Sequence, residues 1–193
     1  MFLMFLGKAA GLLRQILMAG RYATGNPASE AINYATLLPR TVLDVFFASA
    51  FTVGFIPVFS KYFAKEGKRA AFRLTDSFIT LSLAATALIT LILMFAAEPV
   101  FRLFITANND AAFITETMSL GVPMLRIILP TIVLSAGAYC ITGVLQAMDE
   151  FNVPAAMSLA SNILIIIYLL FFEGTFGLTG LAVVFLLGWG AQL

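Results

Sequence analysis

The sequence contains no histidine and a single cysteine, Cys140. The commonest acid–base catalyst and nitrogen metal ligand is therefore missing from the 193 residues. A lone cysteine cannot form a disulfide within the chain, and we interpret Cys140 as a small core residue. The sequence also has no HExxH motif, P-loop lysine motif or Ser/His pair. We therefore expect no catalytic site, no metal site and no cofactor.

Charge is also scarce. Only 11% of the residues are charged, against about 25% in soluble domains, while 61% are hydrophobic and the mean hydropathy is +1.01. Several uncharged apolar runs are long enough to cross the ~30 Å hydrocarbon core of a bilayer. The composition predicts an all-α, polytopic membrane helix bundle in contact with membrane lipid. The net charge of +1 gives no reason to expect a nucleic-acid partner.

Apolar runs separated by turn-forming and charged residues predict six membrane spans. We place them at about residues 2–22, 30–63, 72–97, 115–148, 154–172 and 178–193. The second span is too long for the bilayer at ~1.5 Å per residue, so we expect a kink near Pro39. The amphipathic run 98–105 is expected to lie at the membrane surface. Because the last span is still apolar at Leu193, we expect the sequence to be part of a larger protein.

Basic residues predict how the chain is oriented in the membrane. The densest group lies between the second and third spans and comprises Lys61, Lys65, Lys68, Arg69 and Arg73. Since basic loops face the cytoplasm, this loop and the N-terminus are both expected on the cytoplasmic side. Contact with lipid headgroups is an alternative role for the same residues, but a topology signal is the interpretation we favour.

The first predicted span carries positive charge within an otherwise apolar run. Gly7, Gly11, Arg14 and Arg21 share one face of a helix. An arginine near the bilayer centre costs about 2.5–3.5 kcal/mol on insertion scales, so Arg14 should face a hydrated cavity where an anionic ligand offsets that cost. A structural salt bridge at Arg14 is the alternative. For Lys8, a site in the cavity and snorkelling to the interface both remain open.

The second and fifth spans contain further polar residues. Glu30 opens the second span, where the positive end of the helix dipole favours a carboxylate. Arg40 and Asp44 are one turn apart, a spacing that allows an ion pair within the bundle or a pair of ligand-binding groups. Asn162 in the fifth span is expected to hydrogen-bond across a helix–helix interface.

Several of these segments together resemble one known family, the MurJ/MviN lipid II flippases of the multidrug/oligosaccharidyl-lipid/polysaccharide exporter superfamily. The similarity extends in order and spacing over essentially the whole chain. The matching segments are Gly7–Arg14, Glu30-Ala31 before Leu38-Pro39, Ala50–Val58, Leu125–Pro130 and Phe151–Ala155.

The resemblance implies a two-lobe transporter of the bacterial cytoplasmic membrane that moves lipid II by alternating access during peptidoglycan and cell-wall synthesis. This chain would be the N-terminal lobe, and its partner would be the C-terminal lobe of the same protein. The family's cavity cations and acid fall on Lys8, Arg14 and Glu30, which would bind the lipid diphosphate. Asp44 stands where the family usually carries an arginine, with Arg40 one turn earlier as a possible substitute.

Asp44 places a negative charge where the family usually carries a positive one, so other functions are considered as well. A different polyprenyl-diphosphate-linked glycan is one alternative, and an exporter of amphipathic or cationic drugs with the same fold is another. A membrane scaffold in which every charge is paired is the third. The driving force would be the membrane potential or an ion gradient, and the sequence does not identify a coupling ion.

Overall fold

The computed structural model describes residues 2–22, 25–45, 54–105, 110–148, 150 and 152–192, which form helices and no strand. Within these residues, three helical stretches are long and apolar enough to cross a membrane: Arg69–Phe95, Ala111–Ile128 and Asn152–Gly190. The all-α membrane helix bundle expected from the composition is confirmed. The predicted count of six spans stays a prediction.

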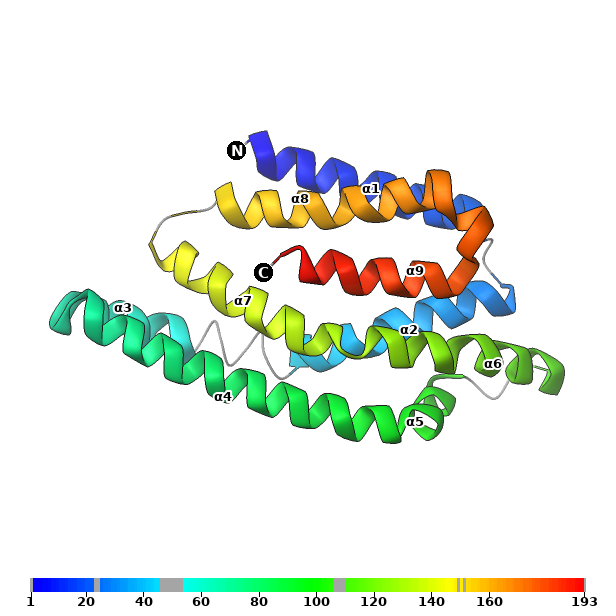
Figure 1. The fold of residues 1–193 in the computed structure, drawn as a ribbon, viewed down its shortest axis with the longest axis horizontal. Coiled ribbons are helices and arrows are strands. Elements are labelled where there is room, and N and C mark those ends of the chain that lie inside the picture. The colour runs from blue at the N-terminus through cyan, green and yellow to red at the C-terminus, as the bar shows by residue number, and fades with distance from the viewer. Residues whose placement is uncertain are drawn as a thin grey trace.

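Helix α1 (Phe2–Arg21) is followed by α2 (Pro27–Leu43), which returns in the opposite direction (Figure 1). The Asn26 side chain caps α2 by accepting a hydrogen bond from the Ser29 amide at 2.7 Å. Pro27 follows in the first turn of α2, where a backbone N–H would have no acceptor within the helix. The Asn26-Pro27 pair therefore sets the start of α2.

The stretch 30–63, expected as one kinked span, belongs to two helices. Helix α2 continues past Pro39 to Leu43, and α3 (Ile56–Glu66) begins with Pro57 in its first turn. A proline is tolerated in a first turn because the amide nitrogen there has no intrahelical partner. Helix α2 thus continues through the predicted kink at Pro39, and residues 46–53 lie outside the described part.

Helix α4 (Lys68–Phe95) leads into the short α5 (Ala97–Phe104). The expectation that residues 98–105 lie at the membrane surface stays a prediction, but one face of α5 packs on protein, because Ala97 and Phe101 are fully buried. The Phe101 ring packs edge-on against Tyr34 of α2, with ring centroids 6.1 Å apart, and it fills the space left by the missing side chain of Gly121. The apolar face of α5 is therefore covered by protein.

The predicted span 115–148 corresponds to α6 (Ala111–Ile128) and α7 (Thr131–Ala147), with a break at Leu129-Pro130. Pro130 cannot donate to the helix before it, so a new helix begins at that point. Helices α6 and α7 follow one another along the bundle (Figure 1).

Helix α8 (Asn152–Ile167), the π-helical turn η3 (Tyr168–Phe172) and α9 (Glu173–Gly190) form an antiparallel pair of helices (Figure 1). Gly177 interrupts the start of α9 with φ 54° and ψ −144°, a conformation that L-residues with a side chain rarely adopt. The chain therefore reverses direction within the stretch 172–178, which separates the two predicted spans.

The helices pack in a fixed pattern along the bundle. Helix α1 lies along α8, α2 along α6, and α4 along α7, while α9 contacts α6, α7 and α8 (Figure 1). The largest core cluster lies between α2, α5, α6 and α9 and includes Phe101, Leu125, Leu129, Leu169 and Leu181. A second cluster between α3, α4 and α7 contains Cys140, which is 1% exposed as expected for a core residue.

Candidate functional site

A cavity of about 1220 Å³ lies between α1, α2, α7, α8 and α9. This volume exceeds the ~300–1000 Å³ of ordinary small-molecule pockets. Of the five charged residues that the sequence offers as ligand-binding groups, four line the cavity, namely Lys8, Arg14, Arg40 and Asp44, whereas Glu30 does not. The lining charges among the described residues are therefore three cations and one anion.

The glycines of α1 determine which face of the helix meets α8. A Cβ atom added to Gly7 would lie 3.7 Å from the Ala155 carbonyl oxygen, and one added to Gly11 would lie 3.6 Å from the side-chain amide nitrogen of Asn162. Asn162 also donates a hydrogen bond to the Gly7 carbonyl at 3.4 Å, so its expected role across a helix–helix interface is confirmed. With α1 held against α8 in this way, Arg14 lines the cavity beside the interface.

Arg14 is half-buried, and its Nε is fully buried with no hydrogen-bond partner in the described part of the chain. The alternative of a structural salt bridge at Arg14 is not seen among those residues. Arg40 lies close enough for its like charge to act on Arg14. A buried donor without a partner costs about 1–3 kcal/mol. This part of the cavity is therefore suited to a ligand with anionic oxygen atoms.

Arg40 and Asp44 form the ion pair that their spacing predicts, with Nε and Oδ2 3.5 Å apart. Their side chains are 80% and 58% exposed, so the pair lies in the open cavity and not inside the bundle. Exposed pairs of this kind contribute only about 0–1 kcal/mol. Arg40 is therefore only weakly held and can exchange Asp44 for another anion.

Glu30 lies in the first turn of α2, as expected, and is half-buried. It interacts with Tyr34, one turn later on the same helix. The structure does not bring its carboxylate to the cavity with the cations of α1. A role for Glu30 in ligand binding stays a prediction.

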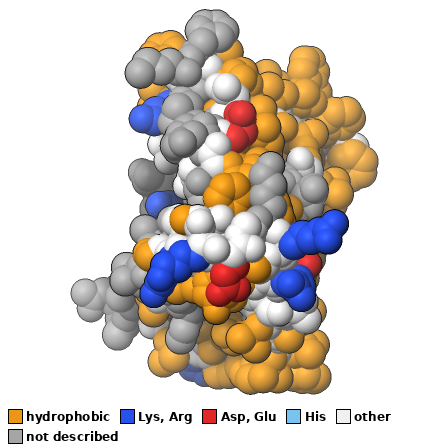
Figure 2. Space-filling view, turned by 90° about the vertical axis from the view of Figure 1, so that its left-hand side faces the viewer, with side chains coloured by type: hydrophobic (Ala, Val, Ile, Leu, Met, Phe, Trp, Pro, Cys, Tyr) orange, Lys and Arg blue, Asp and Glu red, His pale blue; other side chains and the backbone are white. Residues whose placement is uncertain are grey.

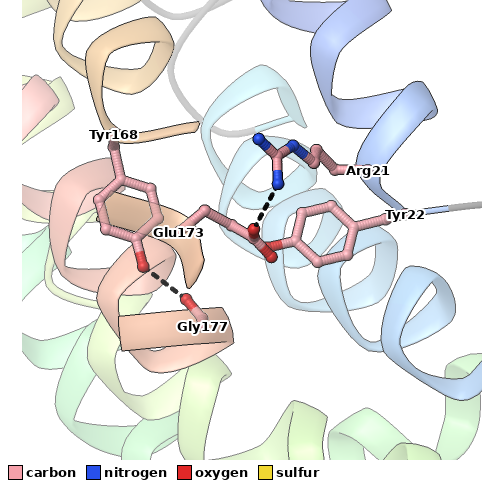
Figure 3. Close-up of polar contacts among 5 residues, drawn as sticks. All are labelled: Arg21, Tyr22, Tyr168, Glu173 and Gly177. Atoms are coloured by element: carbon pink, nitrogen blue, oxygen red, sulfur yellow. Dashed lines mark hydrogen bonds and ion pairs between the residues drawn. The ribbon is translucent and has the colours of Figure 1, made fainter. Parts of the chain in front are cut away.

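A polar network at the opposite end of α1 escaped the sequence analysis, which treated Arg21 only as part of a charged face. Arg21 donates to Glu173 at 3.1 Å, and the Tyr22 hydroxyl donates to the same carboxylate at 3.2 Å (Figure 3). The Tyr168 hydroxyl donates to the Gly177 carbonyl at 2.6 Å beside them. Glu173 is the only charged residue after Glu150 in the sequence. That isolation, in an apolar stretch, was the available signal that Glu173 needs a partner.

The comparison with known proteins decides the family. A family model described as lipid II flippase MurJ matches residues 22–193. The chain belongs to the MurJ family. The resemblance read from the sequence motifs is thus confirmed, and this family consists of flippases, not enzymes. A MurJ-family chain with these apolar helices is a multi-pass membrane protein.

Two curated MurJ relatives are similar over most of this chain. A probable lipid II flippase MurJ of Buchnera aphidicola subsp. Baizongia pistaciae is 28% identical over 174 residues, which cover 89% of this chain and 33% of the relative. One of Bdellovibrio bacteriovorus is 26% identical over 162 residues, 82% of this chain and 30% of the relative. The chain spans about a third of the length of these MurJ relatives. Lys8 and Arg14 precede the range matched by the family model, so their assignment depends on the motif of α1 and on the cavity.

Proposed function

We propose that this chain is the N-terminal lobe of a lipid II flippase and that its cavity binds the diphosphate of lipid II. The observation that carries the proposal is the buried, unpartnered Nε of Arg14 in a cavity that Lys8 and Arg40 also line. A diphosphate supplies several anionic oxygen atoms, and an arginine can bind two of them at once. Lysine at position 8 supplies a charge without that two-point geometry.

Arg40 and Asp44 are suited to reversible binding. Because their ion pair is exposed and weak, Arg40 can leave Asp44 for a phosphate and return when the substrate departs. Asp44 thereby limits how tightly the diphosphate is held. A transporter benefits from such a limit, since it must release its substrate on the other side of the membrane.

The orientation proposed from the basic residues agrees with the arrangement of the helices. The N-terminus and the junction of α3 with α4, which carries Lys65 and Arg69, lie at the same end of the bundle (Figure 1). Seen from that end, Lys and Arg side chains lie towards both sides of the face with acidic and other polar groups between them, and hydrophobic side chains cover the upper right and the bottom (Figure 2). We assign this end to the cytoplasmic side of the inner membrane.

The charges of the cavity favour this function over the two other classes considered. An exporter of cationic drugs would need an acidic cavity, whereas cations outnumber Asp44 three to one among the described lining residues. A scaffold with all its charges paired would not leave the Nε of Arg14 without a partner in the described part of the chain. In the proposed transporter, a C-terminal lobe of the same protein closes the cavity and alternates its access.

Depletion of the full-length protein in its own bacterium tests the proposal. Lipid II should accumulate in the inner leaflet, and a full-length copy should restore its appearance on the outer surface while an Arg14→Ala copy should not. An unchanged distribution of lipid II after depletion would rule the function out. Accumulation of another polyprenyl-diphosphate-linked glycan instead would identify that glycan as the substrate.

A further inference from the structure

An aromatic pair on α7 and α9 forms part of the wall of the cavity that the cations of α1 also line. Tyr139 of α7 and Trp189 of α9 both line the cavity, with ring centroids 6.0 Å apart and planes inclined at 57°. Helices α7 and α9 pack against each other, which holds the two rings together (Figure 1). Tyr139 remains 41% exposed. The rings thus present apolar surface to a ligand inside the cavity.

The pair lies next to the charged part of the cavity. The side chain of Tyr139 is within electrostatic reach of both Arg40 and Asp44. Uncharged polar side chains continue the same wall, with Thr142 on α7 three residues after Tyr139 and Gln192 three residues after Trp189. One ligand can therefore touch the cations with one group and the aromatic rings with the next.

The ring of a sugar matches this combination of groups. Its C–H face is apolar and carries partial positive charge, which suits the negative face of an aromatic ring, while its hydroxyls project from the edge towards polar partners. In a glycosyl diphosphate, the sugar is bonded directly to the phosphate that the arginines would hold. A bare diphosphate would leave the aromatic surface of Tyr139 and Trp189 uncovered.

We propose that Tyr139 and Trp189 form a stacking platform for the sugar joined to the diphosphate, so that the cavity recognises a glycosyl diphosphate and not a diphosphate alone. The proposal rests on the proposed function and adds to it the residues that select the glycan. Neither residue carries a charge, and both act by contact with the ring of the sugar.

The test measures equilibrium binding of two radiolabelled probes to the full-length protein in lipid nanodiscs. One probe is undecaprenyl diphosphate, and the other is the same lipid bearing the disaccharide without a peptide. Tyr139→Leu and Trp189→Leu should each weaken binding of the disaccharide probe about three- to tenfold, the loss expected for one aromatic contact. Both variants should bind undecaprenyl diphosphate as the unsubstituted protein does.

Matched variants separate the platform from other effects. Tyr139→Phe and Trp189→Phe keep a ring and should retain most of the affinity for the disaccharide probe. Phe171→Leu removes a ring that is 73% exposed and is not among the residues lining the cavity, so it should change neither affinity. Retained binding by the phenylalanine variants also shows that the protein is folded.

Each remaining outcome has a distinct meaning. If the leucine variants weaken both probes equally, or leave the disaccharide probe unaffected, the platform is overturned while the diphosphate site stands. If the unsubstituted protein binds neither probe, both the platform and the proposed function are overturned. Loss of both probes in Arg14→Ala, with selective loss of the disaccharide probe in Tyr139→Leu, supports both.

Discussion

Arg21 and Glu173 join the end of α1 to the start of α9 through an ion pair with Nη1 and Oε2 3.1 Å apart. Glu173 is the more buried partner, with 19% of its side chain exposed against 49% for Arg21, and it also accepts a hydrogen bond from Tyr22. The two residues lie far apart in the sequence. Their contact therefore fixes one end of α1 against the bend that precedes α9.

Glu173→Gln should lower the thermal stability of the protein in detergent. The change removes the charge while keeping the shape, and the loss should be about 1 kcal/mol or less because Arg21 is half exposed. Thermal unfolding, monitored as the loss of the helical circular dichroism signal, measures the effect. Equal stability of Glu173→Gln and the unsubstituted protein would show that the contact contributes nothing.

Arg14→Ala should weaken the binding of undecaprenyl diphosphate about 10- to 100-fold, the range expected for losing hydrogen bonds to a charged group. Arg14→Lys should recover part of the affinity, since it restores charge but not two-point geometry. Arg126→Ala is the matched control, because Arg126 is an exposed arginine outside the cavity lining. Equal losses for Arg14→Ala and Arg126→Ala would contradict a specific anion site.

Asp44→Asn should leave stability unchanged within about 0.5 kcal/mol, because the pair with Arg40 is exposed. The same change should strengthen diphosphate binding up to about fivefold, since it removes a negative charge and frees Arg40. Thermal unfolding and the binding assay with undecaprenyl diphosphate measure the two effects. A large loss of stability would mean that Asp44 holds the helices together, as a buried ion pair would.

Gly121→Ala should destabilise the protein by about 1–3 kcal/mol, because the new methyl group would overlap the buried ring of Phe101. Adding Phe101→Ala should relieve the overlap, so the double variant should lose less than the sum of the single changes. Gly174→Ala is the control, since nothing lies near the added methyl group. Additive losses in the double variant would show that the two residues do not press on each other.

Local pattern was enough to predict much of this arrangement. Helical periodicity placed Arg14 on the glycine face of α1 and paired Arg40 with Asp44, because both relationships depend on residues within a few turns. Hydropathy identified the helix bundle, because an apolar run long enough to cross a membrane satisfies its backbone hydrogen bonds by forming a helix.

The features that could not be predicted depend on distant segments. Phe101 is buried only because Gly121 on another helix leaves room for its ring, so the amphipathic pattern of α5 was compatible with either protein or lipid. Tyr139 and Trp189 meet because α7 packs on α9, and aromatic residues in a membrane protein have many other uses. Glu30 shows the converse, since its position at the start of α2 was predictable but its distance from the cavity was not.

Among the described helices, α1 makes its extensive contact along α8 alone. The wall that carries Lys8 and Arg14 is thus attached to the remainder mainly through its glycine face and through the link to Glu173. Moving α1 and α8 together would disturb fewer packed surfaces than moving a central helix such as α6. Lys8 and Arg14 are consequently carried by a helix whose position relative to the other described helices depends mainly on α8.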